Sequence, residues 1–352
     1  MSRVVFLDTV SPLPYDSRSF AERAVQGTEA SVMRIAERLG AWVMQHNRTS
    51  AWERYLPVQP LEAEHVVVIR DSSALQQARA LFPKAQLHLW LHDKIRPGSK
   101  RGRRLRRAAP LLRAACVSLI CVSDTQRRDV AETLRWAGIE GLPLCTRYNP
   151  LDPSLRPDGS VVDDRQLVFF ASPNKGLAYA LDAFSGLRRA MPDLQLVVGN
   201  PGYKADMLTA LPGVKLLGPQ PQALIHAQVR RSLCTFHPNF RIPETFGLVY
   251  AESHALGTPV LTHDFGAAAE VVADARQLLP VRRAYRCYEA LVGAVAPRWR
   301  RAPARLAAAA GLFDAYIERI RDWRGGARPV VGPDPRFALE TLATQWRELL
   351  KL

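Results

Sequence analysis

The sequence lacks four features that define common classes of protein. It has no Asp-x-Asp motif and no His/Cys cluster at ligand spacing, so nothing in it predicts a metal site or a cofactor. Its five cysteines form no Cys-x-x-Cys pair, and four lie in or beside apolar runs, which predicts buried thiols in a reducing compartment rather than a disulfide framework. No apolar run reaches about 18 residues, the length that predicts a transmembrane helix. The start of the chain does not have the layout of a signal peptide, and we expect a cytoplasmic protein.

Acidic residues are also scarce relative to basic ones. The chain has 33 Asp and Glu against 48 Lys and Arg, which gives a formal net charge of +15. Such an excess predicts an anionic partner, which is a nucleic acid, a phosphate-bearing substrate or a membrane surface.

Short β-rich runs alternate with amphipathic stretches in both halves of the chain, which predicts α/β domains with parallel sheets covered on both faces. In the first half the predicted strands are 3–10, 42–46, 66–70, 86–91 and 117–122, and the predicted helices are 27–40, 72–83, 104–115 and 124–137. In the second half the predicted strands are 167–171, 194–199, 214–218, 233–237 and 258–262, and the predicted helices are 176–190, 221–231, 246–256 and 282–296.

A stretch rich in proline and aspartate, 149–164, separates the two halves and predicts an interdomain linker. With 352 residues, two domains are the expected number. We predict Rossmann-like, doubly wound domains at 1–160 and 161–335. Because ligands bind beyond the carboxyl ends of parallel strands, two such sheets facing each other would place a site in the cleft between them.

The segment "PETFGLVYAESHALGTPVL", 243–261, places two glutamates eight positions apart, Glu244 before an apolar run and Glu252 inside it. Carboxylates at such positions suit sugar hydroxyls and a ribose diol, because each oxygen accepts a hydrogen bond that its charge strengthens. Gly247 would let a phosphate approach the exposed N–H groups of a helix start. The alternative interpretation is an ordinary surface helix with two solvated acids.

This segment and others in order along the chain resemble the family 4 glycosyltransferases, which have the GT-B fold and an E-x7-E motif. "PETFGLVYAE" followed by "ALGTPVL" resembles that motif. "QGTEASVMRIAERL", "YNPLDPSLRP" and "SPNKGLAYALDAFSGL" resemble the N-terminal loop and first helix, the linker, and the first loop and helix of the donor domain. The resemblance implies that a final helix over 336–352 packs back on the N-terminal domain, which binds the acceptor.

The resemblance also implies a role for individual residues. Glu244, His92 and Lys175 would be catalytic, with Glu244 at the transferred sugar, His92 facing that sugar and Lys175 neutralising the leaving diphosphate. Glu252 would hold the nucleotide ribose, and the backbone amides of Gly247 and Leu248 would hold the distal phosphate. The other implied donor-binding residues are Gly27, Thr28, Asn174, Thr245 and Phe246.

The activity implied is transfer of a sugar from a nucleotide-sugar donor to a cell-envelope glycan or lipid-linked saccharide, such as the core of a lipopolysaccharide. In the family the reaction retains the anomeric configuration, and the departing phosphate takes the acceptor's proton. Two alternatives stay open from the sequence. One is a GT-B phosphorylase or synthase acting on a soluble sugar, and the other is a GT-B protein that binds a nucleotide sugar without turnover.

The segment "KIRPGSKRGRRLRR", 94–107, has eight basic residues in fourteen and no acid. One interpretation is a solvated loop. Nucleic-acid binding is not expected, because the segment lacks the interleaved aromatic residues of a stacking surface. The third interpretation is that the segment docks to an anionic membrane surface or to a phosphorylated glycolipid, since apolar residues follow the arginines as they do in interfacial elements. That interpretation predicts peripheral attachment to the inner face of the plasma membrane.

Overall fold

The computed structural model describes residues 3–22, 25–200, 211–240, 242–281 and 312–352, and the chain packs as two compact units. The first unit comprises the residues up to Phe20, Val25–Pro153 and Pro335–Leu352. The second comprises mainly Ser154–Asp334. The division after Pro153 lies inside the stretch predicted as a linker.

The first unit contains a parallel sheet whose strand order is β3-β2-β1-β4-β5-β6-β7. Its strands are β1 (Val4–Asp8), β2 (Trp42–Gln45), β3 (Tyr55–Pro57), β4 (His65–Ile69), β5 (Gln86–Leu91), β6 (Ser118–Cys121) and β7 (Leu144–Thr146). Every residue of β1 is buried, as expected for a strand covered on both faces. The order reverses between β1 and β4, so this is a doubly wound sheet with its switch point there.

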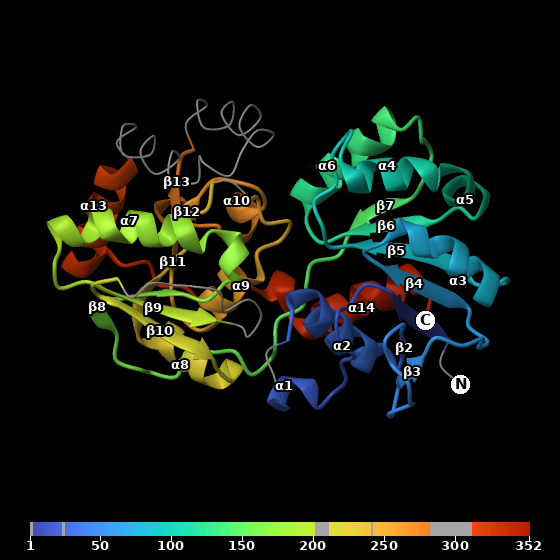
Figure 1. Ribbon diagram of the computed structural model, residues 1–352, viewed down its shortest axis with the longest axis horizontal. Helices are drawn as coiled ribbons and strands as arrows, with labels where there is room; N and C mark the ends of the chain where they lie inside the picture. Colours follow the sequence, from blue (N-terminus) through green and yellow to red (C-terminus); the bar gives the residue numbers. More distant parts are fainter. Residues whose placement is uncertain (1–2, 23–24, 201–210, 241, 282–311) are drawn as a thin grey trace. The chain divides into compact units, whose positions relative to one another are not determined.

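Helices cover both faces of the first sheet. The helices described in this part of the chain are α1 (Ser19–Glu22), α2 (Gly27–Leu39), α3 (Leu75–Leu81), α4 (Lys100–Arg107), α5 (Ala109–Ala114), α6 (Asp124–Trp136) and α14 (Leu339–Leu350), with 3₁₀ turns η1 (Ser72–Ala74) and η6 (Pro335–Phe337). Helix α1 extends past Phe20, where the first unit is interrupted. Helices α2 and α14 lie on the side of the sheet opposite to α4 and α5 (Figure 1). The prediction of one helix over 104–115 was wrong, because this segment forms two helices, α4 and α5, that are divided at Ala108. Helix α4 also starts earlier than predicted, at Lys100, because the Ser99 hydroxyl accepts a hydrogen bond from Gly102 N–H.

The C-terminal helix α14 is anchored to the first sheet by aromatic packing. The buried Trp346 ring contacts Phe6 of β1 and Trp90 of β5, with ring centroids 5.7 and 4.8 Å apart. Aromatic side chains bury large apolar areas, and edge-to-face pairs of this kind add about 0.5–1.5 kcal/mol each. The last residues of the chain are therefore part of the core of the first unit.

The second unit contains a parallel sheet with the order β10-β9-β8-β11-β12-β13. Its strands are β8 (Asp163–Phe169), β9 (Gln195–Asn200), β10 (Val214–Pro219), β11 (Ser232–Phe236), β12 (Val260–His263) and β13 (Leu278–Leu279). The order reverses between β8 and β11, which makes this sheet doubly wound as well.

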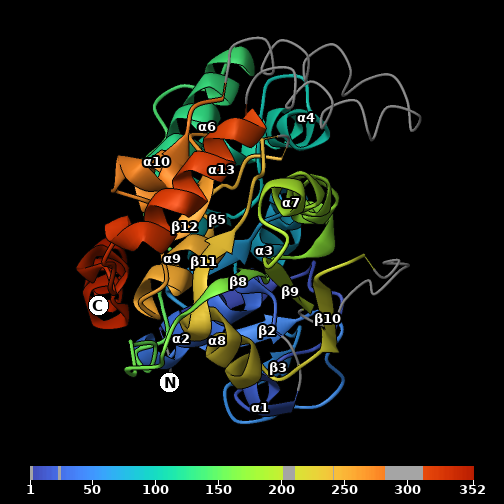
Figure 2. The same ribbon diagram turned by 90° about the vertical axis from the view of Figure 1, so that its left-hand side faces the viewer.

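Among the residues that the structure describes, the helices of the second unit are α7 (Leu177–Ala190), α8 (Gln222–Arg231), α9 (Leu248–Ala255), α10 (Ala268–Val271) and α13 (Leu312–Asp322). Shorter turns are η2 (Pro173–Lys175), η3 (Ala275–Gln277) and η5 (Trp323–Ala327). Helices α7 and α8 lie on opposite sides of β8 and β9, as Figures 1 and 2 show. The helix predicted over 282–296 lies outside the described residues.

The cysteines are only partly buried as predicted. Cys121 and Cys234 are buried thiols and Cys145 is half-buried, but the prediction for Cys116 was wrong, because its side chain is exposed beyond the end of α5. Cys287 lies outside the described residues. Within the parts of the chain that the structure describes, no helix is long and apolar enough to cross a membrane.

Candidate active site

The switch point of the second sheet brings together two loops that are far apart in the sequence. Strand β8 ends at Phe169 and leads to Lys175, and β11 ends at Phe236 and leads to Glu244. Because the two strands are parallel neighbours, their carboxyl ends meet at the same edge of the sheet. This edge is where open α/β sheets bind their ligands.

Lys175 and Glu244 form an ion pair at this edge. Lys175 Nζ donates a hydrogen bond to Glu244 Oε2 over 2.7 Å. The Glu244 side chain is only 5% exposed, whereas that of Lys175 is 45% exposed. The second carboxylate oxygen, Glu244 Oε1, is buried and has no hydrogen-bond partner among the described residues. A buried charged acceptor without a donor is costly, so this oxygen is suited to a hydroxyl group supplied by a ligand.

A small-residue loop fixes the backbone on which Glu244 stands. Gly266 forms a parallel β-bridge with Glu244, and Ala267 N–H donates to the Glu244 carbonyl over 3.0 Å. A Cβ atom at Gly266 would lie 2.6 Å from that carbonyl oxygen, and the residue has φ of +67°. Only glycine meets both conditions, so Gly266 allows the loop to hold Glu244 in place.

Helix α9 begins at Leu248, two residues later than predicted. The sequence predicted a start at Phe246, but Phe246 is a buried residue before the helix and Gly247 is its left-handed cap, with φ of +91°. Leu248 is the first helical residue, and Thr245 and Leu248 are half-buried. Glu252 is half-buried in the second turn of α9. Both glutamates are therefore positioned by α9 and the loop before it.

A buried histidine that was not among the predicted site residues lies beside the ion pair. His237 directly follows β11, stacks on Phe169 with centroids 5.4 Å apart, and lies 3.0 Å through Nδ1 from the Tyr250 hydroxyl. Burial lowers the pKa of His237 to about 4, although the Glu244 charge opposes this effect. The histidine is therefore neutral near pH 7. Its position as the last residue of the predicted strand 233–237 was the signal that could have identified it.

The turn that presents Lys175 is built around another glycine. Gly176 has φ of +110°, and a Cβ there would lie 3.3 Å from the Cβ of Asn239. The Asn239 amide in turn bonds both the N–H and the carbonyl of Ile242, which closes the loop toward Glu244. Asn174, predicted to bind the donor, is exposed and accepts a hydrogen bond from the Ser172 hydroxyl.

The remaining predicted residues belong to the first unit. Gly27 and Thr28 begin α2, where Gly27 is exposed and Thr28 half-buried. His92 directly follows β5, is 8% exposed and packs on Trp90 with ring centroids 4.5 Å apart. Burial and the Arg70 charge lower the pKa of His92 to about 3. A neutral imidazole at this strand end can exchange hydrogen bonds with a sugar hydroxyl.

The buried histidines predict how stability depends on pH. Burial lowers the pKa values of His88, His92, His237 and His263 to about 4, 3, 4 and 4. As the pH falls below about 6.5, the unfolded chain binds protons that the folded chain does not. Each such histidine should then cost roughly 1.4 kcal/mol per pH unit, down to its folded pKa. We expect the melting temperature to be constant near pH 7–8 and to fall from pH 6.5 to 4. A constant melting temperature over that range would contradict the expectation.

The described residues contain no group of three or more His, Cys, Asp or Glu side chains that could hold a metal ion. That the reaction needs no metal ion remains a prediction. The Lys175 ammonium and the N-terminal end of α9 are the groups that could face a diphosphate in place of a cation.

The chain is similar to known proteins in two respects. Solved structures share its fold, and a family model matches most of the second unit. Residues 160–284 match the family model for "Glycosyl transferases group 1". The HepE protein of Anabaena, solved with UDP and glucose, superposes over 100% of both chains with a TM-score of 0.63 at 17% identity. Sucrose-phosphate synthase from Thermosynechococcus elongatus covers 99% of this chain and 98% of its own, with a TM-score of 0.62 at 15% identity. The two doubly wound units thus define a chain of the GT-B fold, as predicted.

The chain is also similar in sequence to curated proteins that are named as mannosyltransferases. Phosphatidyl-myo-inositol mannosyltransferase from Mycobacterium tuberculosis is 30% identical over 175 residues, and that from Mycobacterium leprae is 28% identical over 165 residues. These alignments cover 47% and 45% of this chain and 46% and 44% of the relatives, so the chain spans about half the length of the curated relatives it matches. The predicted resemblance to a glycosyltransferase family is confirmed, and it is residues 160–284 that match the group 1 model.

Proposed function

We propose that the chain transfers a sugar from a nucleotide-sugar donor to a cell-envelope glycan or lipid-linked saccharide, such as the core of a lipopolysaccharide. The reaction retains the anomeric configuration and needs no metal ion. The observation that carries the proposal is the Lys175–Glu244 pair at the switch point, with one buried Glu244 oxygen ready to accept a hydroxyl hydrogen bond. The group 1 family match supports sugar transfer, and the relatives named phosphatidyl-myo-inositol mannosyltransferases support a lipid-linked acceptor.

In the proposed reaction the bond from the anomeric carbon to the phosphate oxygen breaks, and the acceptor oxygen bonds to the same face of that carbon. The acceptor proton passes to the departing phosphate oxygen, so no protein nucleophile is needed. A protonated amine carries three donors, and Lys175 can therefore contact a phosphate oxygen while it stays paired with Glu244. The charge that develops on the leaving diphosphate is stabilised by this ammonium and by the first amides of α9.

The other predicted residues take supporting roles in this proposal. The half-buried Glu252 accepts hydrogen bonds from the ribose diol, and Gly247 leaves room for a phosphate at the backbone. Gly27, Thr28 and His92 keep the donor-binding and catalytic roles that the sequence resemblance implies. The basic residues of 94–107 hold the protein near an anionic membrane surface, where each Lys or Arg contributes about 1 kcal/mol.

Replacing Glu252 with alanine is expected to raise the dissociation constant for the preferred nucleoside diphosphate about 10- to 100-fold. A hydrogen bond to a charged group contributes about 1.5–3 kcal/mol, and 1.4 kcal/mol is tenfold in affinity. Thermal-shift screening with UDP, GDP, ADP and their sugars would first identify the base, because a ligand at a hundredfold its dissociation constant stabilises by about 2.7 kcal/mol. Titration calorimetry would then compare the variants.

The matched control is Glu318→Ala, which removes an exposed glutamate from α13 of the same unit. It should leave nucleotide affinity unchanged. If no nucleotide binds, or if Glu252→Ala binds each one as the unaltered chain does, the donor site proposed at α9 is wrong.

A further inference from the structure

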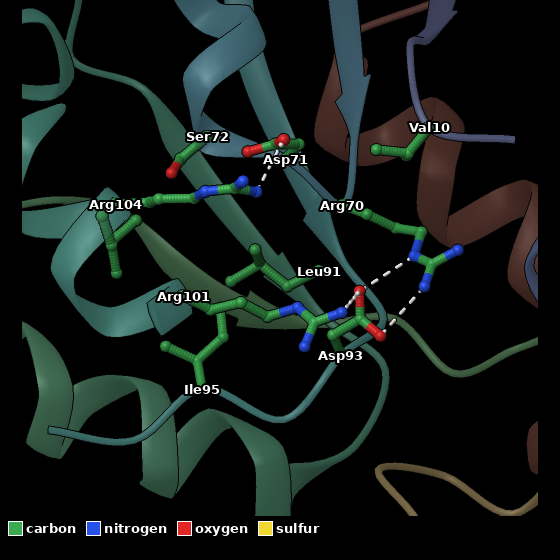
Figure 3. Close-up of a pocket in the computed structure, with 10 residues that line it drawn as sticks. Val10, Arg70, Asp71, Ser72, Leu91, Asp93, Ile95, Arg101 and Arg104 are labelled. Carbon is green, nitrogen blue, oxygen red and sulfur yellow. Dashed lines mark hydrogen bonds and ion pairs between the residues drawn. The ribbon is translucent and has the colours of Figure 1, made fainter. Parts of the chain in front are cut away.

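A cavity of about 160 Å³ lies wholly within the first unit, at the carboxyl ends of its strands (Figure 3). Val10 follows β1, Arg70 and Asp71 follow β4, and Asp93 follows β5. The strand order reverses between β1 and β4, so the cavity sits at the switch point of this sheet. That is the position at which a doubly wound sheet binds a ligand.

Three arginines from two different elements line the cavity. Arg70 comes from the end of β4, and Arg101 and Arg104 come from α4 (Figure 3). Arg70 has φ of +65°, in the left-handed region that costs a non-glycine residue roughly 1–2 kcal/mol. Strain of this kind persists where the surrounding structure requires it, and here it accompanies a side chain that lines the cavity.

Two aspartates hold the arginines in position. Asp93 accepts two hydrogen bonds from Arg70, over 2.9 and 3.0 Å, and pairs with Arg101 over 3.1 Å. Asp71 pairs with Arg104 over 3.0 Å. Although burial favours the neutral acid, the Arg70 and Arg101 charges keep the pKa of Asp93 below its usual value. Asp93 is therefore a carboxylate at neutral pH. By formal charge, three arginines against two aspartates leave one net positive charge on the lining.

The arginines of α4 keep donors for a ligand. Each ion pair engages one guanidinium nitrogen of Arg101 or of Arg104, and a guanidinium carries five N–H donors. The two side chains are 48% and 39% exposed, so solvent reaches them. One arginine can bind both oxygens of a planar carboxylate, as Arg70 binds those of Asp93. Donors that converge from separate elements suit a tetrahedral anion with oxygens in several directions.

We propose that this cavity binds a phosphate group carried by the acceptor, so that the enzyme selects phosphorylated or phosphodiester-linked acceptors. The inference rests on the proposed function, because it assigns the acceptor class of that reaction. Six of the eight residues of α4 are basic and none is acidic, which adds long-range attraction for such an acceptor. Within α4, Arg101 and Arg104 are the basic side chains that line the cavity, so they can donate directed hydrogen bonds to a phosphate bound there.

The closing experiment compares two double variants of the full chain that lose the same charge. Arg101→Gln/Arg104→Gln alters the cavity, and Arg103→Gln/Arg107→Gln alters exposed residues of α4 that do not line it. The probes are dihexanoylphosphatidylinositol as a soluble phosphodiester lipid, inorganic phosphate, and phosphatidylglycerol vesicles. Calorimetry measures the first two, and sedimentation measures the vesicles. UDP and GDP binding is measured in the same preparations.

We expect the cavity variant to raise the dissociation constant for the soluble lipid at least about tenfold, since two charge-assisted hydrogen bonds are lost. The control variant should change it less than about twofold, because bulk salt screens distant charges. Should the cavity variant not fold, Arg101→Lys/Arg104→Lys keeps the charge and loses the planar fork, and it should still weaken lipid binding several-fold.

Equal losses in both variants, or losses confined to vesicles, would overturn the cavity in favour of general attraction to an anionic surface. Inorganic phosphate that binds as tightly as the lipid would overturn the assignment to an acceptor. Nucleotide binding separates the two proposals. If it persists while the lipid arm fails, only the cavity is rejected, and if it is absent, the proposed function fails independently.

Discussion

Replacing Lys175 with methionine is expected to lower turnover about 10²- to 10³-fold, the loss seen when one pre-positioned donor to a developing anion is removed. The same change strips the buried Glu244 carboxylate of its hydrogen-bonded partner. Losing a partner in a fully buried pair costs about 3–5 kcal/mol. Lys175 is 45% exposed, so solvent reduces the effect and we expect roughly 1–2 kcal/mol of lost stability.

The double variant Lys175→Met/Glu244→Gln separates the two roles of the pair. It removes the uncompensated charge, so stability should return to within about 1 kcal/mol of the unaltered chain while activity stays lost. Activity is release of nucleoside diphosphate from the donor chosen by thermal shift, and stability is urea unfolding of the second unit. Lys215→Met, at an exposed position of β10, is the control and should change neither quantity. Recovery of activity in the double variant would show that the pair is only structural.

The main strands were predictable because their burial is uniform. Strands β1, β4 and β5 are short apolar runs whose residues are almost all buried, so the amino acids themselves indicate the element. Strands β3, β7 and β13 have only two or three residues each. They are defined by pairing with a neighbouring strand, which no local pattern of residues shows.

Individual site residues were identifiable from the sequence, but their contacts were not. Lys175 and Glu244 were each singled out, yet the hydrogen bond between them joins positions 69 residues apart and depends on the order of the strands. His237 resembled the end of an apolar strand until the structure placed it against Phe169 and Tyr250.

For the basic segment 94–107, the sequence showed the charge but not the contacts of the individual side chains. Its arginines were visible as an uninterrupted excess of charge, which predicted an anionic partner without distinguishing a surface from a site. The distinction depends on Asp71 and Asp93, which form ion pairs with Arg104 and Arg101 at the cavity. The other arginines of α4 are exposed. The left-handed backbone of Arg70 is likewise a property of the folded chain.

Replacing Gly247 with alanine is expected to destabilise the second unit by about 2–5 kcal/mol and to reduce nucleotide affinity at least tenfold. Two costs combine at this position. The residue has φ of +91°, which alanine adopts only with strain, and the added Cβ would lie 2.4 Å from Cδ2 of the buried Tyr250 ring. Relief of that overlap requires the cap of α9 to move, and the amides proposed to hold the distal phosphate would move with it.

Gly326→Ala provides the matched control, because Gly326 has φ of +103° in the same unit and no atom within 4 Å of an added Cβ. It should carry only the backbone cost, about 1–2 kcal/mol, and leave nucleotide affinity unchanged. Urea unfolding and calorimetry measure the two quantities. If both variants lose the same free energy of unfolding, the Tyr250 ring moves to accommodate the new methyl group. The overlap with Tyr250 is then not the reason that glycine is required at position 247. If Gly247→Ala loses stability but binds nucleotide normally, the glycine serves the fold, and the phosphate contact at the start of α9 must be abandoned.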